Sequence, residues 1–221
     1  MSESLPQGNI DGSYFDALFR VDDDPWKFRS RWYEQRKRAM TLACLPVPRY
    51  ARGYEPGCAN GELSAALASR CDRLLVSDGT DRALEVARER LRALEHVQVA
   101  KAWLPDDWPD ASFDLIVLSE LGYYLDARTL ASMAGQMLAS LAAGGTLLAC
   151  HWRHQIDGCS LSGDDVHAVL DAHLDLPRWC SVVEPDFRID VWCRDSGSVA
   201  TGEGLLSEPQ AQSGSLPVVL T

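Results

Sequence analysis

The 221-residue chain contains no apolar run near the roughly 20 residues that a membrane-spanning helix needs. Its first residues, MSESLPQGNIDGS, lack the basic and apolar regions of a signal peptide, so we expect a cytoplasmic protein without membrane contact. The seven cysteines form no C-x-x-C pair, which argues against a disulfide framework and against a zinc ribbon. We therefore expect reduced thiols and no bound metal.

Basic residues are scarce relative to acidic ones. Lys and Arg number 21 against 32 Asp and Glu, which gives a net charge of −11. Such a chain repels a phosphate backbone, and its one basic cluster, KFRSRWYEQRKR at 27–38, directly follows the acidic run Asp22–Asp24. This charge pattern disfavours nucleic acid as a partner and leaves a small molecule as the expected one.

The order of the predicted elements indicates the fold class. After a loose segment at 1–13, a helical pattern covers 14–45 and is broken at Asp24-Pro25, since proline is tolerated at a helix start but not inside. Strand and helix patterns then alternate. We expect strands at 51–55, 73–77, 97–100, 113–119 and 146–150, with helices at 61–70, 80–94 and 129–141. Apolar strands alternating with helices predict an α/β protein with a parallel sheet buried on both faces.

The pattern changes after Cys150. A helix is expected at 166–174, followed by strands at 179–183 and 187–193, whose short connection implies an antiparallel pair. Residues 196–221 are rich in Gly, Ser, Pro and Gln and contain no Lys or Arg, which predicts a disordered tail. The expected organisation is one domain over 14–195 with 14–45 as a helical lid.

Two acidic residues near strand ends suggest a ligand. The turn after the first strand reads Glu55-Pro-Gly-Cys-Ala-Asn-Gly61, and Asp78 ends the second strand 23 residues after Glu55. A dinucleotide fingerprint would need glycine where the chain has Ala59 and Glu62. A carboxylate suited to an amine and another suited to ribose hydroxyls describe S-adenosylmethionine. Simpler interpretations are a salt bridge for Glu55 and a helix N-cap for Asp78.

Four segments in this order resemble the successive motifs of class I S-adenosylmethionine-dependent methyltransferases: EPGCANG, LLVSD, FDLIVLSE and LAAGGTLL. The segments DDDPW, Tyr33-Glu34 and SELGYYL at 119–125 resemble more narrowly the nodulation protein S type, whose members N-methylate an amino sugar of a chitooligosaccharide. The resemblance implies a three-layer Rossmann-like fold with a seven-stranded, mostly parallel sheet, its last strand antiparallel, under an N-terminal helical lid.

The resemblance also implies which residues bind S-adenosyl-L-methionine and its product S-adenosyl-L-homocysteine. They are Glu55, Gly57, Cys58, Ala59, Gly61, Asp78, Gly79, Glu120 and Leu121, with Trp26 and Lys37 of the lid. The acid that the family usually has after the third strand is missing here. Trp103 could stack on the adenine instead, or Leu104 could offer its backbone, and Asp106 and Asp107 follow slightly later.

The reacting groups are expected after the fourth and fifth strands. Glu120, Tyr124 and His151 are the candidate catalytic residues, with Glu120 or His151 as the base if an amine arrives protonated. One of Tyr123 and Tyr124 is expected to be a core residue, because neighbouring side chains at a strand end point to opposite faces.

The expected activity is methylation of a small molecule, an amino sugar or a similar polar amine, by a monomer or weak homodimer. The alternatives are an O- or C-methyltransferase of another metabolite, a non-catalytic domain that binds S-adenosylmethionine, and an NAD-dependent oxidoreductase. Ala59 and Glu62 argue against the oxidoreductase.

Overall fold

A computed structural model of the chain describes residues 12–195, 197–205 and 218–220. Its strands are β1 (Gly53–Pro56), β2 (Leu74–Asp78), β3 (Val97–Lys101), β4 (Phe113–Ser119), β5 (Leu141–Trp152), β6 (Arg178–Val183), β7 (Phe187–Cys193) and β8 (Val218–Leu220). The helices are α1 (Gly12–Val21), α2 (Trp32–Ala43), α3 (Glu62–Leu67), α4 (Asp81–Leu91), α5 (Ala127–Ser140), α6 (Gly163–His173) and α7 (Val199–Gly202). Short 3-10 helices are η1 (Ala68–Arg70) and η2 (Gly122–Tyr124).

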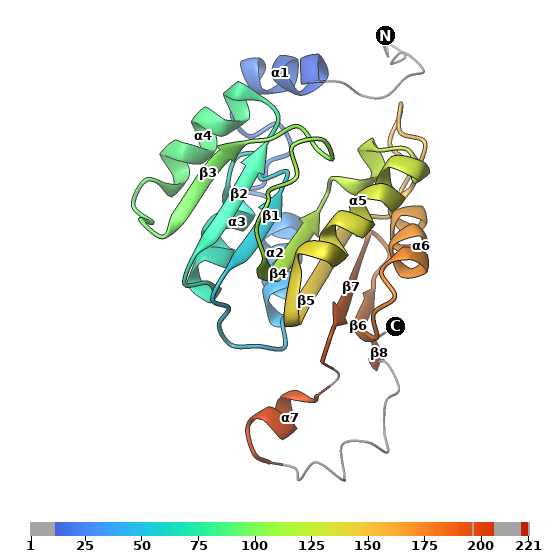
Figure 1. Cartoon of the computed structure of the whole chain (residues 1–221). Coiled ribbons are helices and arrows are strands. Elements are labelled where there is room, and N and C mark those ends of the chain that lie inside the picture. The colour runs from blue at the N-terminus through green and yellow to red at the C-terminus, as the bar shows by residue number, and fades with distance from the viewer. Residues whose placement is uncertain (1–11, 196, 206–217, 221) are drawn as a thin grey trace.

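The strands form one sheet in the order β3-β2-β1-β4-β5-β7-β6-β8. Strands β1 to β5 are parallel, and β7 runs antiparallel to both β5 and β6. The predicted seven-stranded sheet with an antiparallel last strand is thus confirmed for β1 to β7. The three layers are visible in Figure 1.

Two apolar clusters hold the helices against the sheet. One lies between the sheet and α2, α3 and α4, and the other lies between the sheet and α5 and α6. Strand β4 contributes to both, with Leu115 and Val117 on one side and Ile116 and Leu118 on the other, all fully buried. This two-sided burial explains the uninterrupted apolar run that marks β4 in the sequence.

Local signals set several helix starts. Asp126 accepts a hydrogen bond from the Thr129 amide at 2.8 Å and caps α5. Ser162 and Asp165 form a reciprocal capping box at the start of α6. Helix α1 lies at the top of Figure 1 beside α4. Within the described ranges, no helix is both long and apolar enough to cross a bilayer.

The prediction of a disordered tail over 196–221 is wrong for the part that the structure describes. Residues Val199–Gly202 form α7, and Val218–Leu220 pair in parallel with β6, which places β8 at the sheet edge. Because β8 is only three residues long, its strand conformation depends on pairing with β6 rather than on a local pattern. Residues 206–217 and 221 lie outside the described residues.

Several element bounds differ from the prediction, and two of the differences matter for the fold. Strand β5 begins at Leu141 rather than at 146, because Leu141 pairs with Phe113 of β4 before a register shift. At the N-terminus, α1 already begins at Gly12, so the loose segment expected at 1–13 is wrong for its last two residues, and 1–11 lie outside the described residues.

Candidate active site

A cavity of about 1130 Å³ lies at the carboxyl ends of the parallel strands, under the segments that contain α1 and α2. Most of the predicted site residues line it: Trp26, Lys37, Glu55, Gly57, Cys58, Ala59, Asp78, Gly79, Trp103, Leu104, Glu120, Leu121 and Tyr124. Parallel strands end at the same sheet edge, so residues distant in sequence meet there.

Two predicted residues do not line this cavity. Gly61 adopts a left-handed conformation (φ 77°), and a side chain there would press on Ala87 and Leu91 of α4. His151 is completely buried, and its Nε2 accepts the Gly122 amide hydrogen at 3.1 Å. The interpretation of His151 as a base facing the acceptor is therefore wrong, because its acceptor nitrogen is already occupied inside the protein.

The turn after β1 is held in an unusual backbone conformation. Gly57 and Ala59 have positive φ angles of 73° and 48°. The Asp78 carboxylate accepts the Ala59 amide hydrogen at 3.0 Å, so the end of β2 fixes the turn from the neighbouring strand. The turn therefore lines the cavity with Gly57, Cys58 and Ala59, and the hydrogen bond to Asp78 holds its backbone in place.

Glu55 is the most unusual carboxylate at the site. Only 2% of its surface is exposed, and its Oε2 atom is buried without a hydrogen-bond partner. Burial, and then the charge of Asp78, raises the pKa of Glu55 to about 8. A buried carboxylate oxygen without a partner costs free energy, so the position of Oε2 at the cavity wall suits a cationic ligand group.

Asp78 also holds the start of α4. Its Oδ1 accepts the amide and the hydroxyl hydrogens of Thr80, both at 3.0 Å. Burial raises the pKa of Asp78. The residue at the N-cap position is Thr80, so Asp78 supports the helix start and lines the cavity at once. The interpretation of Asp78 as the N-cap itself is therefore wrong, although its carboxylate bonds to the N-cap residue.

The cavity region after β3 is formed by Trp103, Leu104 and Asp106. The Trp103 ring lies directly against Gly79, where an added Cβ would come within 2.1 Å of the ring. Asp107 accepts the Trp103 amide hydrogen at 2.8 Å, whereas Asp106 lines the cavity. Of the two later carboxylates, Asp106 is therefore the one that can reach a ligand.

Glu120 is the centre of a polar cluster that joins the lid to β4 and β5. It has a positive φ of 55°. Its Oε1 accepts from Lys37 Nζ at 2.5 Å, and its Oε2 accepts from the Tyr123 hydroxyl at 2.5 Å and the Trp152 amide at 3.0 Å. Glu34 lies 3.0 Å from the same Lys37. The resemblance implied that Lys37 binds the cofactor, but in the structure its Nζ pairs with the carboxylates of Glu120 and Glu34.

The ionisation of Lys37 is stabilised by these partners. Burial by itself would lower the Lys37 pKa, but the surrounding negative charges, Glu120 foremost, outweigh burial and raise it. Lys37 therefore stays positively charged at every ordinary pH. A charged pair with little exposure links α2 of the lid to the end of β4.

The two neighbouring tyrosines play different structural parts. Tyr123 is 4% exposed and donates to Glu120, while Tyr124 is half-buried at the cavity and packs edge-on against Phe15 at 4.9 Å. Burial raises the pKa of both hydroxyls, so both remain protonated. The expectation that one of the pair is a core residue is confirmed.

Sequence reasoning missed two residues that hold the lid. Asp24 is buried, and its carboxylate accepts from the Phe28 amide at 2.7 Å, the Arg29 amide at 3.0 Å and Asn60 Nδ2 at 2.9 Å. Asn60 lies in the turn after β1, so this contact ties the lid to the cavity floor. The acidic run Asp22–Asp24 is typical of a solvated turn and helix cap, so the sequence did not indicate that Asp24 is buried and bonded to Asn60.

Three comparisons with known proteins agree on one family. A family model described as nodulation protein S matches residues 17–173. Nodulation protein S of Rhizobium tropici is 35% identical over 132 residues, which are 57% of this chain and 54% of the relative. The match thus spans about half the length of that curated relative.

Solved structures show the same fold. A Pseudomonas syringae protein, described only provisionally as a methyltransferase, is 51% identical with a TM-score of 0.67, covering 74% of this chain and 100% of that one. The N-methyltransferase NodS from Bradyrhizobium japonicum WM9, solved with S-adenosyl-L-homocysteine, is 25% identical with a TM-score of 0.73, covering 82% and 97%.

Proposed function

Since this chain belongs to the nodulation protein S family, we propose that it is an S-adenosyl-L-methionine-dependent methyltransferase that methylates an amine of a polar small molecule, such as an amino sugar. The donor's sulfonium supplies an electrophilic methyl group, and the transfer relieves the positive charge on sulfur. The chain's own task is to align donor and acceptor and to keep water out.

The observation that carries this proposal is the unpartnered Oε2 of Glu55. A buried carboxylate oxygen at the cavity wall fits the α-ammonium group of the methionine part of the donor. Asp78 at the neighbouring strand end fits a ribose hydroxyl, since the donors from Ala59 and Thr80 leave about one acceptor position on its carboxylate, on Oδ2. Trp103 and Asp106 offer an aromatic face and an acceptor for adenine.

The acceptor side favours an amine through Glu120. Three donors occupy its carboxylate, namely Lys37, Tyr123 and the Trp152 amide, which leaves about one acceptor position, on Oε1. An ammonium group at that position would form a charge-assisted hydrogen bond and could pass a proton to the carboxylate. Trp152, Tyr33 and Tyr124 add flat aromatic surface suited to a sugar ring.

Isothermal titration with S-adenosyl-L-homocysteine tests the cofactor part of the proposal. We expect binding by the wild type and a loss on the order of 2 kcal/mol for Asp78→Ala, because a charge-assisted hydrogen bond to the ribose disappears. The matched control is Asp81→Ala, an exposed carboxylate three positions further that pairs with Lys101. Equal affinity of Asp78→Ala and wild type would remove Asp78 from the cofactor site.

A further inference from the structure

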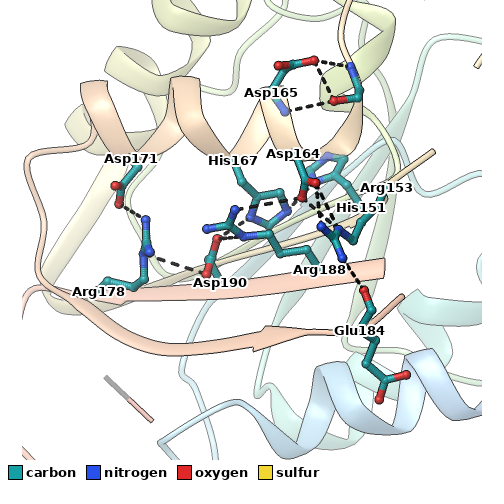
Figure 2. Close-up of polar contacts among 11 residues, drawn as sticks. His151, Arg153, Asp164, Asp165, His167, Asp171, Arg178, Glu184, Arg188 and Asp190 are labelled. Atoms are coloured by element: carbon teal, nitrogen blue, oxygen red, sulfur yellow. Dashed lines mark hydrogen bonds and ion pairs between the residues drawn. The ribbon is translucent and has the colours of Figure 1, made fainter. Parts of the chain in front are cut away.

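Two histidines and an aspartate form a buried chain behind the cavity. His151 Nδ1 lies 3.2 Å from His167 Nε2, and His167 Nδ1 lies 2.6 Å from Asp190 Oδ2. All three residues are 0% exposed. Figure 2 shows His167 of α6 between His151 of β5 and Asp190 of β7. None of the three lines the cavity.

The first link fixes the proton positions along the whole chain. The Gly122 amide can only donate, so His151 Nε2 accepts, and the proton of that ring must be on Nδ1. His151 Nδ1–H then donates to His167 Nε2, and His167 Nδ1–H donates to the Asp190 carboxylate. Both rings are neutral in this arrangement, with the same Nδ1–H tautomer.

The surroundings stabilise this state. Burial lowers the pKa of both His151 and His167, so neither ring gains a second proton near neutral pH. Burial by itself would raise the Asp190 pKa, but the hydrogen bond from His167 and the Arg188 charge lower it to about 2. Arg188 Nε lies 2.7 Å from Asp190 Oδ2, and Arg178 Nε lies 3.8 Å from Oδ1.

The other end of the chain reaches the active-site turn. Gly122 follows Glu120 by two residues, and an added Cβ there would come within 2.5 Å of Val166, so this turn packs closely against α6. Cys150 and Trp152, the two neighbours of His151 in β5, also hold Glu120. The Glu120 amide donates to the Cys150 carbonyl oxygen at 2.9 Å, and the Trp152 amide donates to the Glu120 carboxylate. The strained positive φ of Glu120 is thus maintained from β5.

We propose that His151, His167 and Asp190 are positioning residues for the methyl transfer, which hold the Gly122 amide and thereby aim the Glu120 carboxylate at the acceptor. This inference rests on the proposed function. A purely structural core would be served better by apolar side chains, because buried polar networks cost desolvation free energy. A directed hydrogen-bond chain that ends on the Gly122 amide instead fixes the orientation of the turn that carries Glu120.

The tautomers test the chain without any turnover. In ¹⁵N-histidine-labelled wild type near neutral pH, long-range ¹H–¹⁵N correlation should show Nδ1–H for both His151 and His167, assigned with single His→Gln variants. A proton on Nε2 of His151 would leave the Gly122 amide without its acceptor and would overturn the inference.

Kinetics test the link to catalysis. His151→Phe keeps the ring shape but removes the acceptor, so kcat should fall by about tenfold or more while the dissociation constant of S-adenosyl-L-homocysteine changes little. His151→Gln places an amide oxygen near the Nε2 position and should recover most of kcat. Equal loss of thermal stability in both variants without a difference in kcat would show a merely structural role.

Two further outcomes remain decisive. If the His151→Phe variant does not fold, the tautomers and a comparison of His151→Gln with His151→Asn replace it as the test. The kcat of His151→Gln must then exceed the kcat of His151→Asn. Wild-type protein that binds the cofactor product but methylates no amine would refute the proposed function and, with it, a role in methyl transfer. The tautomers would still show separately whether the chain holds Gly122.

Discussion

The buried carboxylate of Glu55 destabilises the ligand-free fold when it is ionised, but it suits a cationic group of the cofactor. Its carboxylate is buried, and its raised pKa of about 8 shows that the folded protein prefers it protonated. A ligand ammonium at this position would reverse that preference, because an opposite charge stabilises the ionised form. The residue therefore links stability, pH and cofactor affinity at a single oxygen atom.

Replacing Glu55 with Gln should stabilise the ligand-free protein in a pH-dependent way. The folded pKa of about 8 lies above the ordinary 4.5, so the stability contribution of Glu55 is fully present below about pH 4.5 and is lost as the pH rises through 8. Thermal unfolding should therefore show Glu55→Gln gaining Tm over wild type as the pH rises from 5 to 8.

The same substitution should weaken cofactor binding, since a neutral amide cannot pair with an ammonium group. Calorimetry with S-adenosyl-L-homocysteine measures this directly, and Glu89→Gln, an exposed carboxylate of α4 that pairs with Arg92 outside the cavity, serves as the control. A Tm difference that is flat with pH would show that Glu55 is ionised in the free protein.

Individual residues were predictable where a strand end determined their place. Glu55, Asp78 and Glu120 could be assigned to the site because each follows or ends a recognisable strand. His151 was wrongly predicted to face the acceptor, because alternation along β5 does not show which face of the sheet α6 covers. The His151 ring is hydrogen-bonded to His167 of that helix. Asp24 was missed because its three donors come from a turn whose geometry only the folded lid sets.

At the scale of elements, the lid is held by polar contacts between α1 and α2 and within α2. Asp24, in the segment that follows α1, bonds to Asn60. Arg36 of α2 pairs with Glu184 after β6, with Arg36 Nη1 donating to Glu184 Oε2 at 2.6 Å. Exposed pairs contribute little to stability, whereas buried charged acceptors contribute more. Asp24 is therefore the expected anchor of the lid.

Asp24→Ala should loosen the lid more than it destabilises the sheet. Loss of three hydrogen bonds to a buried carboxylate should cost on the order of 2 kcal/mol. Hydrogen exchange should increase over 22–32 with the sheet unchanged, and S-adenosyl-L-homocysteine should bind more weakly. Asp23→Ala, whose half-exposed carboxylate pairs with Arg82, is the matched control and should change neither. Unchanged exchange over 22–32 would rule out Asp24 as the anchor.

Removal of residues 196–221 should preserve cofactor binding. Among the residues that the structure describes, those lining the cavity lie between Tyr14 and Asp186, while β8 pairs with β6 at the far edge of the sheet. We expect a modest loss of Tm, because β6 becomes the edge strand, and an unchanged calorimetric affinity for S-adenosyl-L-homocysteine. A truncated protein that keeps its Tm but no longer binds would contradict this.

Element prediction succeeded where burial leaves a local pattern. The bounds of β4 were predicted correctly from its apolar run, and the hairpin of β6 and β7 from its short turn. The start of β5 at Leu141 was not, because pairing with Phe113 overrides the helical pattern that continues from α5. The same dependence on a partner strand explains why β8 escaped prediction.

At the scale of the whole molecule, topology and charge act together. The parallel strands bring Glu55, Asp78 and Glu120 to one sheet edge, and the lid closes that edge into a cavity. The net charge of −11 favours a cationic acceptor over a phosphorylated one. The mostly parallel sheet was predictable from the alternating strand and helix patterns, whereas the identity of the acceptor depends on contacts that no motif describes.

The central claim is methyl transfer to an amine, and an acceptor pair that differs only in that amine tests it most directly. The protein is incubated with methyl-labelled S-adenosyl-L-methionine and either a chitooligosaccharide with one free amine or its fully N-acetylated counterpart, and products are read by mass spectrometry. The account predicts label only on the oligosaccharide with the free amine, at its nitrogen. Label on a hydroxyl group, or equal labelling of both oligosaccharides, would contradict it.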